Sequence, residues 1–176
     1  MTTDEMKGYV NDVIRLGNAV RQLNELDERA VAQPPPSGAA LEHYARHVGD
    51  DVPPSFLQLL ALHDGIACFD YVDVDLFPMT YLLEHQEELE EEWVDAGKFE
   101  ADEIYVFGRS NNDALAVAFR RTRRASDGDM SVVMFDARGV LAEYTTFEVY
   151  LRSRVEWFQE QLDLEKADRA GLRDDE

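Results

Sequence analysis

The sequence predicts an α+β fold: one domain with a single antiparallel β-sheet of about four to six strands, helices packed on and beside that sheet, and a long amphipathic helix at the N-terminus. Three observations predict this class. Apolar residues recur at three- and four-residue steps through much of the first half of the chain, which is the period of an α-helix. Four short runs rich in β-branched and aromatic residues follow, separated by turn residues. A final apolar stripe with helical spacing runs from Phe147 to Leu162.

The N-terminal helix is expected at about residues 4–28. Its apolar residues form one continuous stripe: Met6, Val10, Val13, Leu16, Val20, Leu23 and Leu26. Such a helix either packs on its own domain or contacts a second chain. The segment AQPPPSG follows, and its three successive prolines favour an extended, stiff connector. The sequence therefore divides into an N-terminal helix with a proline-rich connector (1–33), an α+β domain (34–162) and a charged tail (163–176) that is expected to fray.

Two short helices are expected after the connector. Ser37 can cap the first, which covers residues 38–48. The second lies within residues 52–65 and opens with two prolines. Most of its circumference is apolar, so the rest of the domain is expected to pack around it. Gly65 is expected to end this helix, because glycine adopts a left-handed backbone conformation without steric cost.

Two places in the sequence have the spacing of metal ligands. His43 and His47 lie four residues apart on the first short helix, but no acid or cysteine at a ligand-like spacing completes a set. Asp73 and Asp75 form a D-x-D pair within residues 66–79, where apolar and acidic side chains alternate. That alternation is typical of a half-buried strand, which already explains the pair. The sequence therefore predicts no metal site and no bound cofactor.

An acidic helix is expected at residues 81–96. Its narrow inward stripe consists of Leu82, Gln86, Leu89 and Trp93, and glutamates cover the outside. Residues 81–103 carry ten acids and one lysine, a net charge of −9. Like charges four residues apart each oppose helix formation by a few tenths of a kcal/mol. The acidic face is therefore either an interface for a basic partner or an ordinary solvated face.

The second half of the chain predicts an antiparallel meander. Its four runs lie at 104–107, 114–120, 132–135 and 140–144, with turns between them. The longest turn, 120–129, carries four arginines. On a chain with a net charge of −20, these are expected to offset nearby acids rather than to bind nucleic acid.

The composition narrows the classes of function. The chain has 37 acidic and 17 basic side chains, so its electrostatic field repels nucleic acid and anionic membranes and favours basic partners. No apolar run approaches a membrane span, and the N-terminus lacks the features of a signal peptide. The single cysteine, Cys68, cannot form an internal disulfide and suits a reducing compartment. We therefore expect a cytoplasmic protein, and its oligomeric state stays open.

Several of these segments together resemble the SUKH superfamily, the Smi/Knr-type fold. The similar segments are LEHYARHVG, the following VPPSF and a run that closes in HDG, and then Phe107-Gly108, Asp113-Ala114-Leu115, residues 132–136 and FEVYL at 147–151. The resemblance covers about residues 37–158. Members of this superfamily are not known as enzymes. Many bacterial members are immunity proteins that neutralise a toxin, often a nuclease, and fungal relatives are regulatory binding proteins in cell-wall signalling.

The resemblance implies a non-enzymatic binding protein, most simply an immunity protein whose partner is a basic toxin domain. No Ser-His-Asp arrangement and no glycine-rich phosphate loop is present, so no catalytic residue is expected. The residues expected to bind the partner are Asp73, Asp75, Glu84, Glu87, Glu88 and Glu91. Two alternatives stay open. One is a regulatory or scaffold protein that binds through the first helix, and the other is a metal-dependent hydrolase that uses Asp73, Asp75 and a histidine.

Overall fold

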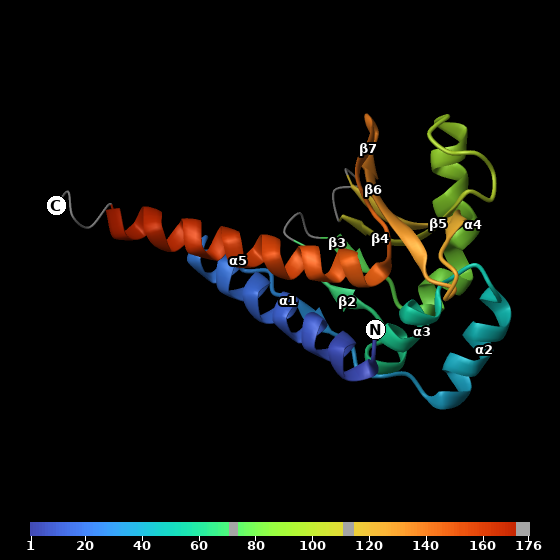
Figure 1. Ribbon diagram of the computed structural model, residues 1–176, viewed down its shortest axis with the longest axis horizontal. Coiled ribbons are helices and arrows are strands. Elements are labelled where there is room, and N and C mark those ends of the chain that lie inside the picture. The colour runs from blue at the N-terminus through green and yellow to red at the C-terminus, as the bar shows by residue number, and fades with distance from the viewer. Residues whose placement is uncertain (71–73, 111–114, 172–176) are drawn as a thin grey trace.

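The computed structural model describes residues 1–70, 74–110 and 115–171 (Figure 1). In these parts of the chain, five helices and one seven-stranded antiparallel sheet form an α+β fold, which confirms the predicted class. The helices are α1 (Thr3–Leu23), α2 (Gly38–Val48), α3 (Pro54–Leu62), α4 (Met79–Asp95) and α5 (Phe147–Gly171). The strands are β1 (Val31–Ala32), β2 (Ile66–Ala67), β3 (Val74–Leu76), β4 (Ile104–Ser110), β5 (Ala116–Arg124), β6 (Met130–Asp136) and β7 (Gly139–Tyr144).

The strands lie in the sheet in chain order, from β1 at one edge to β7 at the other. Each strand pairs antiparallel with the next, so the meander predicted for the second half of the chain is confirmed. The sheet has more strands than the four to six expected, because the two-residue strands β1 and β2 extend it beyond β3. Strands this short are set by pairing with a neighbour and leave no periodic signal in the sequence.

Residues 66–79 contain a hairpin, and the single strand that their alternation predicted is wrong. β2 and β3 pair through Ile66 and Leu76. The chain reverses after β2, where Cys68 has a left-handed φ of 51° and the Phe69 N–H donates to the Val74 carbonyl at 2.7 Å. Among the described residues, the predicted alternation holds within β3, where Val74 and Leu76 are buried and the residue between them is half-buried.

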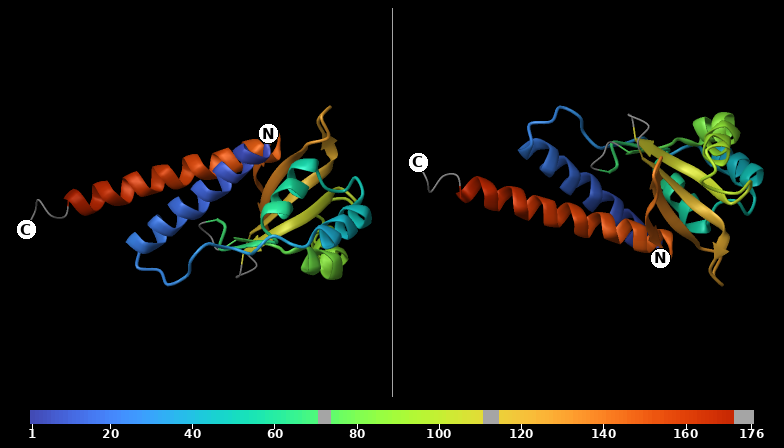
Figure 2. Two further views of the ribbon diagram at one scale, coloured as in Figure 1. Left: turned by 90° about the horizontal axis from the view of Figure 1, so that it is seen from below. Right: turned by 90° about the horizontal axis from the view of Figure 1, so that it is seen from above.

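Helices lie on both faces of the sheet (Figure 2). Large aromatic side chains fill the space between the sheet and these helices. On one face, the ring of Phe56 from α3 lies 5.2 Å from the rings of Phe107 in β4 and Phe119 in β5. On the other face, the ring of Phe135 in β6 lies 4.8 Å from the ring of Trp93 in α4. As expected for its apolar sequence, α3 is surrounded, and it contacts α1, α2 and α5. Because both faces are covered, the central strands are buried along most of their length.

The N-terminal helix packs on other helices of the same chain, α3 and α5. α1 lies alongside α5, and the two helices run in the same direction (Figures 1 and 2). A Cβ at Gly17 would lie 3.2 Å from the ring of Phe158, so this glycine allows the two helices to approach closely. Most of the predicted apolar stripe of α1 is buried: Met6, Val10, Val13, Leu16 and Val20. A partner that binds through this stripe would first have to displace α5.

Besides α4, which covers Met79–Asp95 instead of residues 81–96, three helix ends differ from the sequence prediction. α1 ends at Leu23 instead of near residue 28, because Glu25 adopts a left-handed φ of 57° and the Leu26 N–H turns back to the Arg21 carbonyl. α5 continues to Gly171, where the chain was expected to fray from residue 163. Residues 163–171 contain no proline and several strong helix formers, so the helix extends past its last buried side chain, Leu162.

The third difference concerns Gly65, which was expected to end α3. α3 ends at Leu62, and His63 after it is already extended. Gly65 does have a positive φ, 93°, but its role is to permit close contact between two segments. A Cβ at this position would lie 2.9 Å from both the Leu76 carbonyl oxygen and the Pro78 nitrogen.

None of the helices in the described part of the chain has the length and apolar character needed to cross a membrane.

Candidate protein-binding surface

The outward face of α4 carries four of the six residues predicted to bind a partner. Glu84, Glu87, Glu88 and Glu91 are all exposed, and the side chains of Glu84 and Glu88 keep 73% and 79% of their accessible surface. Their position follows from the helical period, because the side chains that α4 buries are on the opposite side: Met79, Leu82, Leu89 and Trp93. The structure therefore brings these four glutamates together on about two turns of one helix.

Two other glutamates of α4 have a structural role that the sequence did not indicate. Glu90 accepts hydrogen bonds from both terminal nitrogens of Arg121 in β5, each at 2.8 Å. Glu92 binds Arg109 of β4 in the same two-pronged way, with both distances 2.9 Å. Such bidentate pairs are the strongest geometry for an ion pair between arginine and a carboxylate. These two acids hold α4 on the sheet, so they are not available to a partner.

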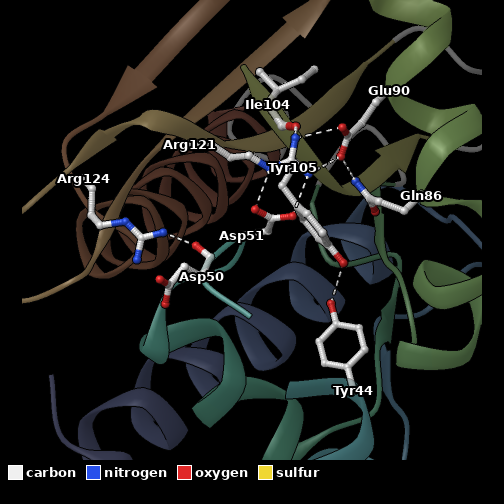
Figure 3. A network of polar contacts seen from close by, with 9 residues as sticks. All are labelled: Tyr44, Asp50, Asp51, Gln86, Glu90, Ile104, Tyr105, Arg121 and Arg124. Carbon is white, nitrogen blue, oxygen red and sulfur yellow. Dashed lines mark hydrogen bonds and ion pairs between the residues drawn. The ribbon is translucent and has the colours of Figure 1, made fainter. Parts of the chain in front are cut away.

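Arg121 is the centre of the polar network that joins α4 to the sheet and to the α2–α3 turn (Figure 3). Besides Glu90, it contacts the Asp51 carboxylate at 3.4 Å and donates to the carbonyl of Ile104. Its guanidinium lies over the ring of Tyr105, 5.3 Å from the ring centroid. Burial lowers the pKa of Arg121, but the hydrogen bonds and charge of Glu90 outweigh burial and raise that pKa overall. The guanidinium therefore stays charged and paired.

The same network continues into the interior. The hydroxyl of Tyr105 lies 2.7 Å from the hydroxyl of Tyr44 in α2, and burial raises the pKa of both phenols. Arg124, near the end of β5, donates to the carbonyl of Asp50. These contacts explain two of the four arginines of the 120–129 segment, which bind groups of their own chain as expected.

The acidic face of α4 continues into a hollow beside the helix. This hollow has a volume of about 440 Å³ and lies between α4 and the segment that leads to β4. Six acidic residues line it: Glu87, Glu90, Glu91, Asp95, Glu100 and Asp102. Five of the six, all except Glu90, together with Glu84 and Glu88 form what we call the acidic surface. Apart from the Glu90–Arg121 pair and the contacts of Glu84 and Glu88 with His85, these acids make no ion pair with the described residues.

The remaining two predicted residues are not part of this surface. Asp73 lies outside the described residues. Asp75 is on β3, and its carboxylate accepts a hydrogen bond from the Cys68 N–H at 2.7 Å. Asp75 lines a different cavity, of about 510 Å³, at the N-terminal end of α4. We call it the α4 N-terminal cavity.

Asp64 lines the α4 N-terminal cavity as well, and sequence reasoning missed it because it seemed only to help end α3. Its carboxylate accepts a hydrogen bond from the Met79 N–H at 2.8 Å, which caps the first turn of α4. No local pattern connects Asp64 with a helix that begins fifteen residues later. Apolar and aromatic side chains form much of the wall, among them Ile66, Leu76, Phe77 and Tyr81.

The described residues do not assemble the metal site of the hydrolase alternative. Within residues 1–70, 74–110 and 115–171, no three histidine, cysteine, aspartate or glutamate side chains are placed to hold one metal ion. His43 and His47 are both exposed on α2. Asp75, the described member of the D-x-D pair, is held by the backbone N–H of Cys68.

No protein-family model matches the chain, and no curated protein matches it in sequence.

Proposed function

We propose that this protein is a non-enzymatic binding protein of the immunity type, which binds and neutralises a basic protein partner through the acidic surface. The observation that carries this proposal is the set of four exposed glutamates on α4 with the acidic hollow beside them. Of the α4 acids, Glu90 and Glu92 pair with arginines of the sheet. The four exposed glutamates of α4 repel one another and make no contact with the core.

That repulsion favours a basic partner. Glu84 and Glu88 lie four residues apart on the helix, as do Glu87 and Glu91, and each such like-charged pair opposes helix formation. Arginines and lysines of a partner would pair with these carboxylates and turn the repulsion into attraction. The net charge of −20 would also raise the association rate, an effect that weakens as salt rises.

A toxin that acts on nucleic acid is the partner class with the best fit. Its substrate-binding surface must be basic to hold a phosphate backbone. A helix that presents four carboxylates can occupy that surface and exclude the substrate. The resemblance to the SUKH superfamily supports the same reading, since many bacterial members act in this way. We also propose a cytoplasmic location, because this protein would have to bind the toxin in the compartment that contains the toxin's nucleic-acid substrate.

The test needs a partner, and the products of the neighbouring reading frames are the first candidates to express with this chain. Binding of the purified pair is then measured by calorimetry at low and at high salt. The variant carries Glu84→Lys, Glu87→Lys, Glu88→Lys and Glu91→Lys. Its matched control carries Glu156→Lys, Glu160→Lys, Asp163→Lys and Asp168→Lys on exposed positions of α5, which changes the net charge by the same amount.

We expect the α4 variant to stay folded and to bind at least roughly tenfold more weakly, with much less dependence on salt. The α5 control should keep both the affinity and most of the salt dependence. If the α4 variant binds with unchanged affinity and salt dependence, the acidic surface is only a solvated face and the proposal is wrong.

A further inference from the structure

We infer that the α4 N-terminal cavity binds an arginine side chain of the protein partner. This inference rests on the proposed function, because the cavity would anchor the same basic partner that binds the acidic surface beside it. The cavity volume of about 510 Å³ falls within the range of sites that enclose a ligand group. Its chemistry, two carboxylates in a largely apolar wall, points to the kind of group it takes.

The two carboxylates are held in place and have unused capacity. Asp64 and Asp75 each accept one backbone N–H, from Met79 at 2.8 Å and from Cys68 at 2.7 Å. A carboxylate can accept about four hydrogen bonds, so both retain acceptor positions. Neither forms an ion pair with a cation among the described residues. Two negative charges therefore line one cavity without a counterion from the described chain.

The apolar walls favour arginine over other cations. A guanidinium is planar, has five N–H donors and is weakly hydrated, so it can bond to more than one carboxylate at little cost in desolvation. The methylene stem of arginine packs against apolar surface while its charged end reaches a polar group. Ile66, Leu76 and Phe77 offer such a surface beside the two aspartates. A lysine ammonium is compact and strongly hydrated, and a neutral side chain would leave both charges uncompensated.

The cavity also lies where a partner on the acidic surface would reach it. Tyr81, which lines the cavity, belongs to the first turns of α4, and its ring lies 4.5 Å from the ring of His85. His85 in turn contacts Glu88 at 3.2 Å. An arginine that extends from a basic surface over α4 can therefore enter the cavity. Arginine is among the residues that most often anchor protein interfaces in this way.

The walls are preformed. Gly65 brings the α3–β2 turn so close to the β3–α4 segment that a Cβ would lie 2.9 Å from backbone atoms on the other side. The backbone N–H of Cys68 holds the carboxylate of Asp75, and that of Met79 holds the carboxylate of Asp64. A rigid site loses less entropy when a side chain enters it, which is the property expected of an anchor pocket.

The experiment uses the full chain and needs no partner. The isotope-labelled protein is titrated with N-acetyl-arginine methylamide, with the citrulline analogue of the same shape but no charge, and with the lysine analogue. Chemical-shift changes in amide NMR spectra locate the binding site. We expect the arginine probe to shift Gly65, Ala67 and Tyr81 with a Kd on the order of 1 mM, as suits a ligand of this size. The citrulline and lysine analogues should each bind at least roughly tenfold more weakly.

Two variants then test the carboxylates. Asp64→Asn and Asp75→Asn remove the charge but keep an oxygen that can accept the same backbone N–H, and melting curves check that each stays folded. Each should weaken the arginine probe roughly tenfold. Glu87→Gln makes the same change on the exposed face of α4 and should alter the Kd by less than about twofold.

The inference is overturned if citrulline or lysine binds as tightly as arginine, if the shifts map to 84–91 instead of the cavity, or if Glu87→Gln weakens binding as much as the aspartate variants do. The comparison of the three probes on the unmodified chain remains decisive even if a variant fails to fold. The α4 variant with four lysines separates this result from the proposed function. If that variant loses partner binding but still binds the arginine probe at the cavity, the result supports both the proposed function and the arginine site. If the probe does not bind even to the unmodified chain, the arginine site is overturned and the proposed function is unaffected.

Discussion

Replacing Glu90 with glutamine should destabilise the protein, although Glu90 looks like one more member of an acidic helix. Glu90 and Arg121 keep only 16% and 15% of their side-chain surface, and two hydrogen bonds of 2.8 Å join them. Removing one partner of a fully buried ion pair costs about 3–5 kcal/mol, because the other charge stays behind without compensation. Here the loss is smaller, since Arg121 keeps Asp51 and the Ile104 carbonyl, and the new amide can still accept one hydrogen bond.

We therefore expect Glu90→Gln to lower the free energy of unfolding by about 2 kcal/mol. For a chain of this size, that corresponds to a fall in Tm of roughly 4–8 °C. Glu87→Gln is the matched control, one turn earlier on the same helix and fully outward. It makes the same chemical change but relieves repulsion with Glu84 and Glu91, so it should be neutral or stabilising by at most about 0.5 kcal/mol.

The measurement is urea and thermal unfolding at neutral pH, followed by far-UV circular dichroism. A double-mutant cycle with Arg121→Gln isolates the pair, and its coupling energy should lie in the range of about 1–3 kcal/mol. If the free energies of unfolding of Glu90→Gln and Glu87→Gln agree within about 0.5 kcal/mol, then Glu90 does not stabilise the fold more than Glu87 does. The distinction between acids of α4 that hold the helix on the sheet and acids that are available to a partner would then be wrong.

Two further predictions follow from the backbone and from the buried phenols. Gly65→Ala should lower the free energy of unfolding in urea by about 2 kcal/mol or more, because Gly65 has a positive φ and an added Cβ would lie 2.9 Å from backbone atoms. Gly97 has a positive φ of 66° but open space around it, so Gly97→Ala should lower the free energy of unfolding by only about 1 kcal/mol. Equal losses at the two sites would contradict the close packing described for Gly65. Burial raises the pKa values of Tyr44, Tyr105 and Tyr150 above those of the unfolded chain. Their contribution to stability is therefore fully present below about pH 10 and is lost as the pH rises toward the folded values. In an alkaline titration, these three phenols should ionise only together with loss of circular dichroism, and reversible ionisation in the folded protein near pH 10 would show that they are accessible.

The elements of this fold could be predicted wherever their signal is local. The period of the apolar residues in the sequence predicts each helix and the four long strands of the meander, and the bounds of α2 match the prediction. The period of the apolar residues does not predict elements whose position depends on strand pairing or on packing against distant parts of the chain. The two-residue strands β1 and β2 exist because neighbours complete them, and the hairpin at β2 and β3 depends on a left-handed residue, Cys68, that carries no turn signature. The end of α1 also depends on a left-handed residue, Glu25, whereas α5 extends beyond the prediction because its last residues are themselves good helix formers.

The candidate site divides in the same way. The sequence by itself determined that Glu84, Glu87, Glu88 and Glu91 lie outward, because an apolar stripe on a helix decides which side faces water. Only the tertiary structure decided which other acids are neutralised. Arg121 and Arg109 come from strands 31 and 17 residues away from the glutamates they bind. The α4 N-terminal cavity likewise joins Asp64, which lies between α3 and β2, with Asp75 of β3. Charge partners and cavity walls depend on distances in space, and the period of a sequence contains only distances along the chain.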